Sequence, residues 1–389
     1  MRKYLVEVPE EVAKRLEQSG ATSMHIDNQL LVIRPDDSTA LIPQLRFRSF
    51  GALAVLFALA FLTFFKWATK APSVLPWAGE YSISSSIALL SMVSGIISFA
   101  VAFIRQKVTK QGPARDFTWR SLLPLVVACA MIIAIIALGL GWLIDQLLPG
   151  LGLDQYTASV LIFVSLSIVN YLLINLAYTL SPGVVINLMT IMIIGGVGVA
   201  MLTNSSKDWW RYNFSFLGTH SSESAWQFNI TLIFAGMLMA TLVDYLFVNL
   251  AKQYQNWKLA LLRWFLWVLA ANIAGIGLFP NDPKYHWLHD QIAMWLVYLL
   301  WILIVIVRWC LPKVTSQFLK VSYVIGGVIV LDYFMFKVVR YLSLTAFELF
   351  AFALAFAWIL LLFQYIESLL PSGKEIVPVK LVPIKKQDQ

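Results

Sequence analysis

The stretch from Gln291 to Leu311 reads QIAMWLVYLLWILIVIVRWCL, and it decides the class of fold. Arg308 is its one charged residue, and its length is close to the roughly 20 residues that cross a bilayer as an α-helix. Its centre, Trp301 to Val307, is continuously apolar, whereas a strand of a membrane barrel alternates apolar and polar residues. The stretch therefore predicts a transmembrane helix.

The same pattern recurs along most of the chain. Of its 389 residues, 59% are hydrophobic and 13% charged, against about 45–50% and about 25% in soluble domains. This composition excludes a soluble globular enzyme. We expect transmembrane helices at 49–66, 83–104, 121–144, 158–180, 183–203, 227–250, 259–279, 291–311, 317–339 and 344–366. The sequence thus predicts an all-α, polytopic integral membrane protein with about ten transmembrane helices.

Basic residues are distributed unevenly between the connecting segments. If the N-terminus is cytoplasmic, 22 of the 29 Lys and Arg residues lie on the cytoplasmic side and 7 on the other. Positive residues are enriched on the cytoplasmic side of membranes. We therefore expect a multi-pass protein of the cell membrane with a cytoplasmic N-terminus and C-terminus, and with residues 204–225 and 280–290 facing outward.

Four regions follow from these patterns: a small cytoplasmic α/β segment (1–45), a four-helix membrane part (46–182), a six-helix membrane module (183–367) and a flexible cytoplasmic tail (368–389). The first region predicts a strand at 4–8, a helix at 10–18 and a hairpin around Asp27-Asn28. Its length is small for an independent core, so we expect it to pack on the membrane domain or on a protein partner.

Charged residues fall within or beside three of the expected spans: Asp244, Asp332, Lys337, Arg340 and Glu348. Charge in hydrocarbon is costly unless it is paired or hydrated. In one interpretation these residues form two ion-pair clusters, with Asp244 on the side of Arg308 and Lys320, and Asp332 close to Lys337 or Arg340. In the other, they line a polar cavity for a headgroup, an ion or a proton.

Three of the four histidines lie in the two expected outer loops. His286 and His289 are spaced i, i+3 at the start of the eighth span and so share a helix face. Together with His220 and Asp290 they offer three imidazoles and a carboxylate, a set that can bind zinc and leave one position for water. The alternatives are interfacial loop residues that bond the backbone at helix ends, and a metal-free polar pocket.

Other patterns carry little functional information. The sequence has no HExxH, GxSxG, Walker or strand-associated GxGxxG motif. Gly195, Gly196 and Gly198 lie inside a span, where glycine allows close helix packing. Tryptophans near the span ends indicate the aromatic belt of the bilayer, so no nucleic acid partner is expected. Cys129 and Cys310 lie in apolar stretches and are expected to be core residues.

Short motifs in the second half resemble a known family. They are Asn213-Phe-Ser-Phe-Leu-Gly218 followed by Trp226-Gln-Phe-Asn229, and Gly277-Leu-Phe-Pro280 followed by His289-Asp290. Over roughly 183–366 they resemble the bacterial membrane family called domain of unknown function 998, and more distantly the Frag/DRAM/Sfk-like six-helix proteins. The matching positions are Ser215, Gly218, Phe228, Asn272 and His289. The resemblance implies lipid-related roles among the distant relatives and no particular reaction.

We therefore expect a protein that binds or moves a lipid or small solute through an outward-facing polar pocket, with membrane lipids as partners. Ser215, Asn272 and His289 would line this pocket, and His220, His286 and Asp290 would form its rim. The alternative is a metal-dependent membrane lipid hydrolase with His220, His286 and His289 as zinc ligands. A further alternative is an accessory subunit of a membrane complex that docks a protein partner through its basic N-terminal segment.

Overall fold

The computed structural model describes residues 4–7, 22–27, 30–35, 47–68, 74–79, 81–251, 254, 256–370 and 380–383. The chain divides into two compact units. One is made of residues 1–45 together with 371–389, and the other of residues 46–370.

The first unit contains two antiparallel strand pairs. β1 (Tyr4–Glu7) pairs with β6 (Lys380–Pro383), and β2 (Thr22–Asp27) pairs with β3 (Leu30–Pro35). The first strand and the hairpin expected from the sequence are present, whereas the helix expected at 10–18 lies outside the described residues. The β1–β6 pairing brings together segments near the two ends of the chain within this unit.

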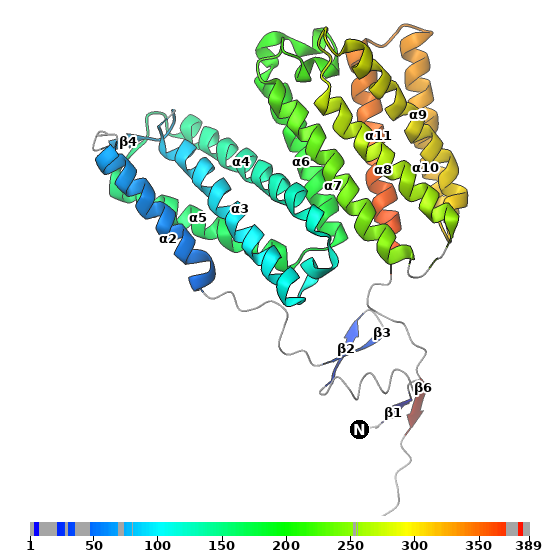
Figure 1. Ribbon diagram of the computed structural model, residues 1–389, viewed down its shortest axis with the longest axis horizontal. Helices are drawn as coiled ribbons and strands as arrows, with labels where there is room; N and C mark the ends of the chain where they lie inside the picture. The colour runs from blue at the N-terminus through cyan, green and yellow to red at the C-terminus, as the bar shows by residue number, and fades with distance from the viewer. Residues whose placement is uncertain are drawn as a thin grey trace, which may run out of the picture. The chain divides into compact units, whose positions relative to one another are not determined.

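The described part of the second unit contains ten helices that are long and apolar enough to cross a membrane (Figure 1). They are α2 (Phe47–Thr63, continued by a π-helical turn, Phe64–Ala68), α3 (Ile83–Thr109), α4 (Leu122–Leu147), α5 (Gln155–Tyr178), α6 (Pro182–Thr203), α7 (Ala225–Ala251), α8 (Trp257–Leu278), α9 (His286–Cys310), α10 (Ser316–Lys337) and α11 (Leu344–Ser368). The expected number of spans is confirmed. Two short strands, β4 (Val74–Pro76) and β5 (Gly152–Asp154), pair with each other, and five 3₁₀ turns lie at Pro113–Asp116, Trp119–Ser121, Ser205–Lys207, Trp209–Arg211 and Phe214–Gly218.

Hydrogen bonds between polar side chains and neighbouring helices hold the N-terminal helices together. Asn170 on α5 is fully buried; its Oδ1 accepts from Ser94 Oγ on α3 at 3.0 Å, and its Nδ2 donates to the Phe50 carbonyl on α2 at 3.2 Å. Trp77, next to β4, donates from Nε1 to the Gly141 carbonyl on α4 at 2.8 Å. In a bilayer, hydrogen bonds between helices contribute about 0.6 kcal/mol on average. These hydrogen bonds therefore add little to the free energy of unfolding, and their main effect is to specify which helices lie next to each other.

Small residues set the packing of the helices that follow α5. The most extensive helix contact in the chain joins α7 to α8. Gly236 on α7 lies against the Ala270 carbonyl and the Ala274 side chain of α8, and Gly196 on α6 lies against the Thr231 side chain of α7. The packing role expected for the glycines of α6 is confirmed at Gly196, whereas Gly198 faces open space.

The two expected parts of the membrane domain are in contact through α4. This helix packs on α6 and α7, and the Phe117 ring just before it stacks on Tyr245 of α7 with centroids 4.5 Å apart. Residues 46–370 form one compact unit, and the division into four and six helices stays a prediction.

Alternation of the helices places Ser205 and Gln111 at opposite ends of this unit. With cysteine introduced at either position, we expect an impermeant thiol reagent to label Ser205→Cys in intact cells and Gln111→Cys only after permeabilisation, because the basic residues gather at the Gln111 end. The native cysteines, Cys129 and Cys310, are buried and give a low background. Labelling of both variants from the same side would refute the alternation.

The α7–α8 contact gives a second prediction. Gly236→Ala should lower the unfolding temperature in detergent, since its Cβ would overlap the Ala270 carbonyl and cost about 1–3 kcal/mol. Gly198→Ala is the matched control, because a Cβ there meets no atom and alanine favours helix by about 1 kcal/mol. Equal destabilisation of both variants would show that close approach is not the cause.

Candidate functional site

Two loops meet at one end of helices α6–α11. We call the resulting site the polar cap: loop 204–224, loop 279–285, and the first turns of α9 and α11. α11 anchors the first loop, because Glu348 accepts a hydrogen bond from the Phe214 backbone N–H at 2.5 Å and Thr345 Oγ1 donates to the Trp210 carbonyl at 2.9 Å. In Figure 1 the two loops lie at the upper ends of α6–α9.

A chain of polar side chains crosses the cap from loop to loop. Ser215 Oγ lies 3.3 Å from Asn213 Oδ1 and accepts from Asn281 Nδ2 at 3.1 Å. Asn281 Oδ1 is 2.5 Å from His286 Nδ1, and His286 Nε2 is 3.5 Å from Asp290 Oδ2. The second loop is therefore joined to the first through Asn281, and Ser215 contacts an amide rather than an imidazole.

Asp282 joins the loops a second time. Its Oδ1 accepts from the His220 backbone N–H at 2.9 Å, and its Oδ2 lies 3.7 Å from His220 Nε2, beyond hydrogen-bond distance. The residue is 5% exposed, whereas the His220 side chain is 89% exposed. A buried carboxylate thus faces an imidazole that is almost fully exposed to solvent.

His289 is buried, unlike its neighbour His286. The α9 helix begins at His286 as expected, but His289 turns inward and its Nδ1 lies 2.8 Å from the Phe279 carbonyl. This bond ties α9 to the end of α8. It matches the interpretation in which histidines bond the backbone at helix ends.

Asn272 lies deeper in the bundle than the rest of the predicted set. Gly275 on α8 faces Ile292 on α9, and His289 contacts Phe279, so the two helices run antiparallel with residue 279 level with His289. Seven residues separate Asn272 from that level, which is about 10 Å of helix. The structure thus brings Ser215, His220, His286, His289 and Asp290 to one end and leaves Asn272 about two turns away. Ligand binding by these side chains stays a prediction.

Several buried oxygen atoms near this end have no hydrogen-bond partner. They are Asp282 Oδ2 and Asn229 Oδ1 in the cap region, and Asn272 Oδ1 further along α8. Asn229 otherwise donates from Nδ2 to the Gly218 carbonyl at 2.9 Å. Because all three free atoms are acceptors, a molecule that satisfied them would have to supply donors.

The three histidines do not converge on a common centre. His220 faces Asp282, His286 faces Asn281 and Asp290, and His289 faces a carbonyl. In the part of the chain that the structure describes, no group of three or more His, Cys, Asp or Glu side chains is placed to hold a metal ion. The zinc site considered from the sequence has no counterpart in this arrangement, because His286 and His289 bond to different partners and the exposed His220 ring faces Asp282 alone.

The intramembrane charges pair differently from the two clusters considered above. Asp244 bonds to Arg263 of α8 at 2.8 Å and accepts from Trp267 Nε1 at 3.2 Å, so it joins α7 to α8 rather than facing Arg308 or Lys320. The partner comes from α8 because α8 packs directly on α7, which places Arg263 beside Asp244.

Asp332 is 7% exposed, and its Oδ2 has no hydrogen-bond partner. The ion pairs among the described side chains include neither Asp332 nor Lys337 nor Arg340. Lys337 and Arg340 are exposed at the end of α10 instead. The expected pairing of Asp332 with them is therefore absent from the described ion pairs.

Two residues central to the cap were not assigned that role from the sequence. Asn281 bridges Ser215 and His286, and Glu348, expected among the intramembrane charges, binds the loop backbone instead. Asn213 did carry a usable signal: asparagine is favoured before a helical turn, and Asn213 caps Phe216 N–H at 2.7 Å. Asn281 and Glu348 carried no such sequence signal, because Ser215 and Phe214, the residues that they bind, are distant from them in sequence.

Ten apolar helices with polar side chains paired between them define a multi-pass membrane protein. The family described as "Protein of unknown function (DUF998)" matches residues 188–365, which confirms the resemblance over that segment and includes the whole polar cap. No curated protein and no solved structure matches the chain.

The Asp244–Arg263 pair yields a third prediction. Asp244→Asn and Arg263→Gln should each lower the unfolding temperature in detergent, and a double-mutant cycle should give a coupling of about 1.5–3 kcal/mol, because the bond is charged and partly buried. Arg308→Gln is the control, since Arg308 is exposed near the end of α9 and unpaired among the described ion pairs. A coupling near zero would mean that the helices associate without this pair.

Proposed function

We propose that this membrane protein binds a cationic group with hydrogen-bond donors, the primary ammonium of a lipid headgroup or of a small solute, at the polar cap. The uneven spread of basic residues between the loops supports an outward-facing position for the cap. Binding at this position would precede either retention of the molecule or its movement along the helices.

The charge of the cap supports a cationic ligand. Asp282, Asp290 and Glu348 meet there, and Glu348 and Asp290 lie close enough to interact electrostatically. None of the three pairs with Lys or Arg among the described side chains. In the described ion pairs Asp282 lies opposite His220, and Asp290 lies opposite His286. Carboxylates gathered without a permanent cation favour one that is bound.

The observation that carries the proposal is the buried carboxylate of Asp282. One of its oxygens fixes the His220 backbone, and the other has no hydrogen-bond partner although the residue is almost fully buried. A buried acceptor without a partner costs about 1–3 kcal/mol, and more when it is charged. An ammonium group that donates to Asp282 Oδ2 would remove that cost.

Hydrolysis is less well supported. A serine nucleophile needs a base within hydrogen-bond reach, and Ser215 is separated from His286 by the Asn281 side chain. The accessory-subunit alternative depends on the N-terminal unit, whose described strands pair with one another and with the C-terminal segment. Docking of a cytoplasmic partner at that unit would not explain why Asp282 in the polar cap has a buried oxygen without a hydrogen-bond partner.

The test compares two lipids that differ in donors. The full-length protein is purified from an equal mixture of phosphatidylethanolamine and phosphatidylcholine, and the retained lipid is measured by native mass spectrometry. We expect the ethanolamine lipid to be preferred, because its ammonium has N–H donors and the choline group has none. Asp282→Asn keeps an acceptor for His220 and removes the charge, so retention should fall about tenfold.

Asp208→Asn is the matched control, because Asp208 lies in the same loop but pairs with Arg211 at the surface. It should leave retention unchanged. Displacement of the lipid by millimolar ethanolamine would identify a small solute as the ligand. Equal retention of the two lipids, with no effect of Asp282→Asn or of ethanolamine, would refute the proposal.

A further inference from the structure

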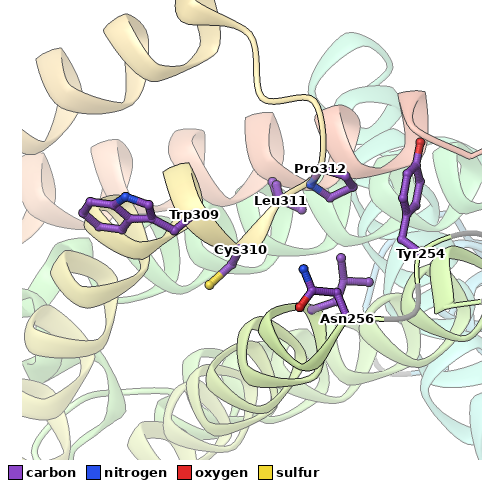
Figure 2. Close-up of a pocket in the computed structure, with 7 residues that line it drawn as sticks. Tyr254, Asn256, Trp309, Cys310, Leu311 and Pro312 are labelled. Carbon is purple, nitrogen blue, oxygen red and sulfur yellow. The ribbon is translucent and has the colours of Figure 1, made fainter.

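A second feature lies at the opposite end of the helices from the polar cap. A cavity of about 290 Å³ opens between the α7–α8 connection and the α9–α10 connection (Figure 2). Tyr254, Asn256 and Leu259 line one side of it. Trp309, Cys310 and Leu311 line the other. This end is the one that the basic residues place in the cytoplasm.

The chain around this cavity is basic and almost free of acid. No Asp or Glu occurs between Tyr245 and Asn281 or between Gln291 and Leu331, whereas six Lys and Arg residues do: Lys252, Lys258, Arg263, Arg308, Lys313 and Lys320. Asp244 neutralises Arg263. The ion pairs between described side chains include none of Lys258, Arg308, Lys313 and Lys320. The surroundings of the cavity therefore favour an anion.

Donors are available in the cavity and beside it. Lys258 does not line the cavity, but it lies in sequence between the lining residues Asn256 and Leu259, is half-buried, and is close enough to Cys310 in the lining to act on its thiol electrostatically. Asn256 uses Oδ1 to cap the Lys258 backbone N–H at 3.1 Å, which leaves its Nδ2 as a donor. In Figure 2 that nitrogen points toward the side formed by Cys310 and Leu311.

The remaining lining residues suit the boundary of a bilayer. Trp309 is 58% exposed, as is usual for tryptophan at the headgroup level. Leu259 and Leu311 present apolar surface beside the donors. A molecule with a phosphate at one end and hydrocarbon at the other would meet both kinds of surface. Basic pockets between helices on the cytoplasmic side bind such headgroups in other membrane proteins.

We propose that this cavity binds the phosphate headgroup of an anionic phospholipid from the adjacent leaflet, with Lys258 as its principal cation and Asn256 as a neutral donor. The site is independent of the polar cap: it lies at the other end of the helices, and it selects the opposite charge.

The test uses the full-length protein with phosphatidylglycerol and phosphatidylcholine in equal amounts, read by native mass spectrometry. Wild type should retain phosphatidylglycerol in preference. Lys258→Gln should weaken that retention about fivefold, the effect of one cation near a membrane surface. Lys258→Arg should restore it, because the charge is kept.

Lys207→Gln is the control: Lys207 is an exposed lysine in loop 204–224, at the other end of the helices from the cavity, so its replacement should not change phosphatidylglycerol retention. Absence of a phosphatidylglycerol preference, or an equal loss in Lys258→Gln and Lys207→Gln, would overturn the proposal. Displacement of the lipid by millimolar inorganic phosphate would assign the cavity to soluble phosphate and overturn the lipid part. Asp282→Asn should not affect this binding, so the two proposals can fail separately.

Discussion

Backbone N–H and C=O groups inside a hydrocarbon layer have no water to bond, so each spanning segment must satisfy them internally. The ten helices of this chain follow from that constraint. The positions of the polar side chains and of the irregular backbone follow from it as well. Polar side chains within the spans bond to adjacent helices, as Asn170 does to Ser94 and Asp244 to Arg263. In the described part of residues 47–370 the irregular backbone lies at the helix ends, and both candidate binding sites are found there.

The two ends differ in chemistry because loops on the two sides of a membrane differ in charge. The polar cap brings Asp282, Asp290 and Glu348 together and leaves a buried acceptor free. The cavity beside Lys258 and Asn256 offers a cation and a donor with no acid in the flanking sequence. One helical framework thus presents an acidic site at one end and a basic site at the other.

Rigidity of the cap depends on contacts across long stretches of sequence. Glu348 holds the backbone of Phe214, and Asn281 holds Ser215. A loop fixed in this way presents its polar groups in one arrangement, so the binding proposed for the cap would cost little ordering entropy. His289 has a comparable structural role at the start of α9, because its contact with the Phe279 carbonyl ties α9 to the end of α8.

Local sequence patterns determined two features of the fold: hydropathy predicted the ten spans, and the strand and turn residues around Asp27-Asn28 predicted the hairpin formed by β2 and β3. Only the tertiary structure decided which helix faces meet. It paired Asp244 with Arg263, left Asp332 without the expected partner, turned Glu348 toward a loop and joined β1 to β6. The hydropathy of such helices does not indicate which face contacts a neighbouring helix, because the lipid and the interior of the bundle are equally apolar. Side-chain partners across helices therefore could not be predicted from spacing along the chain.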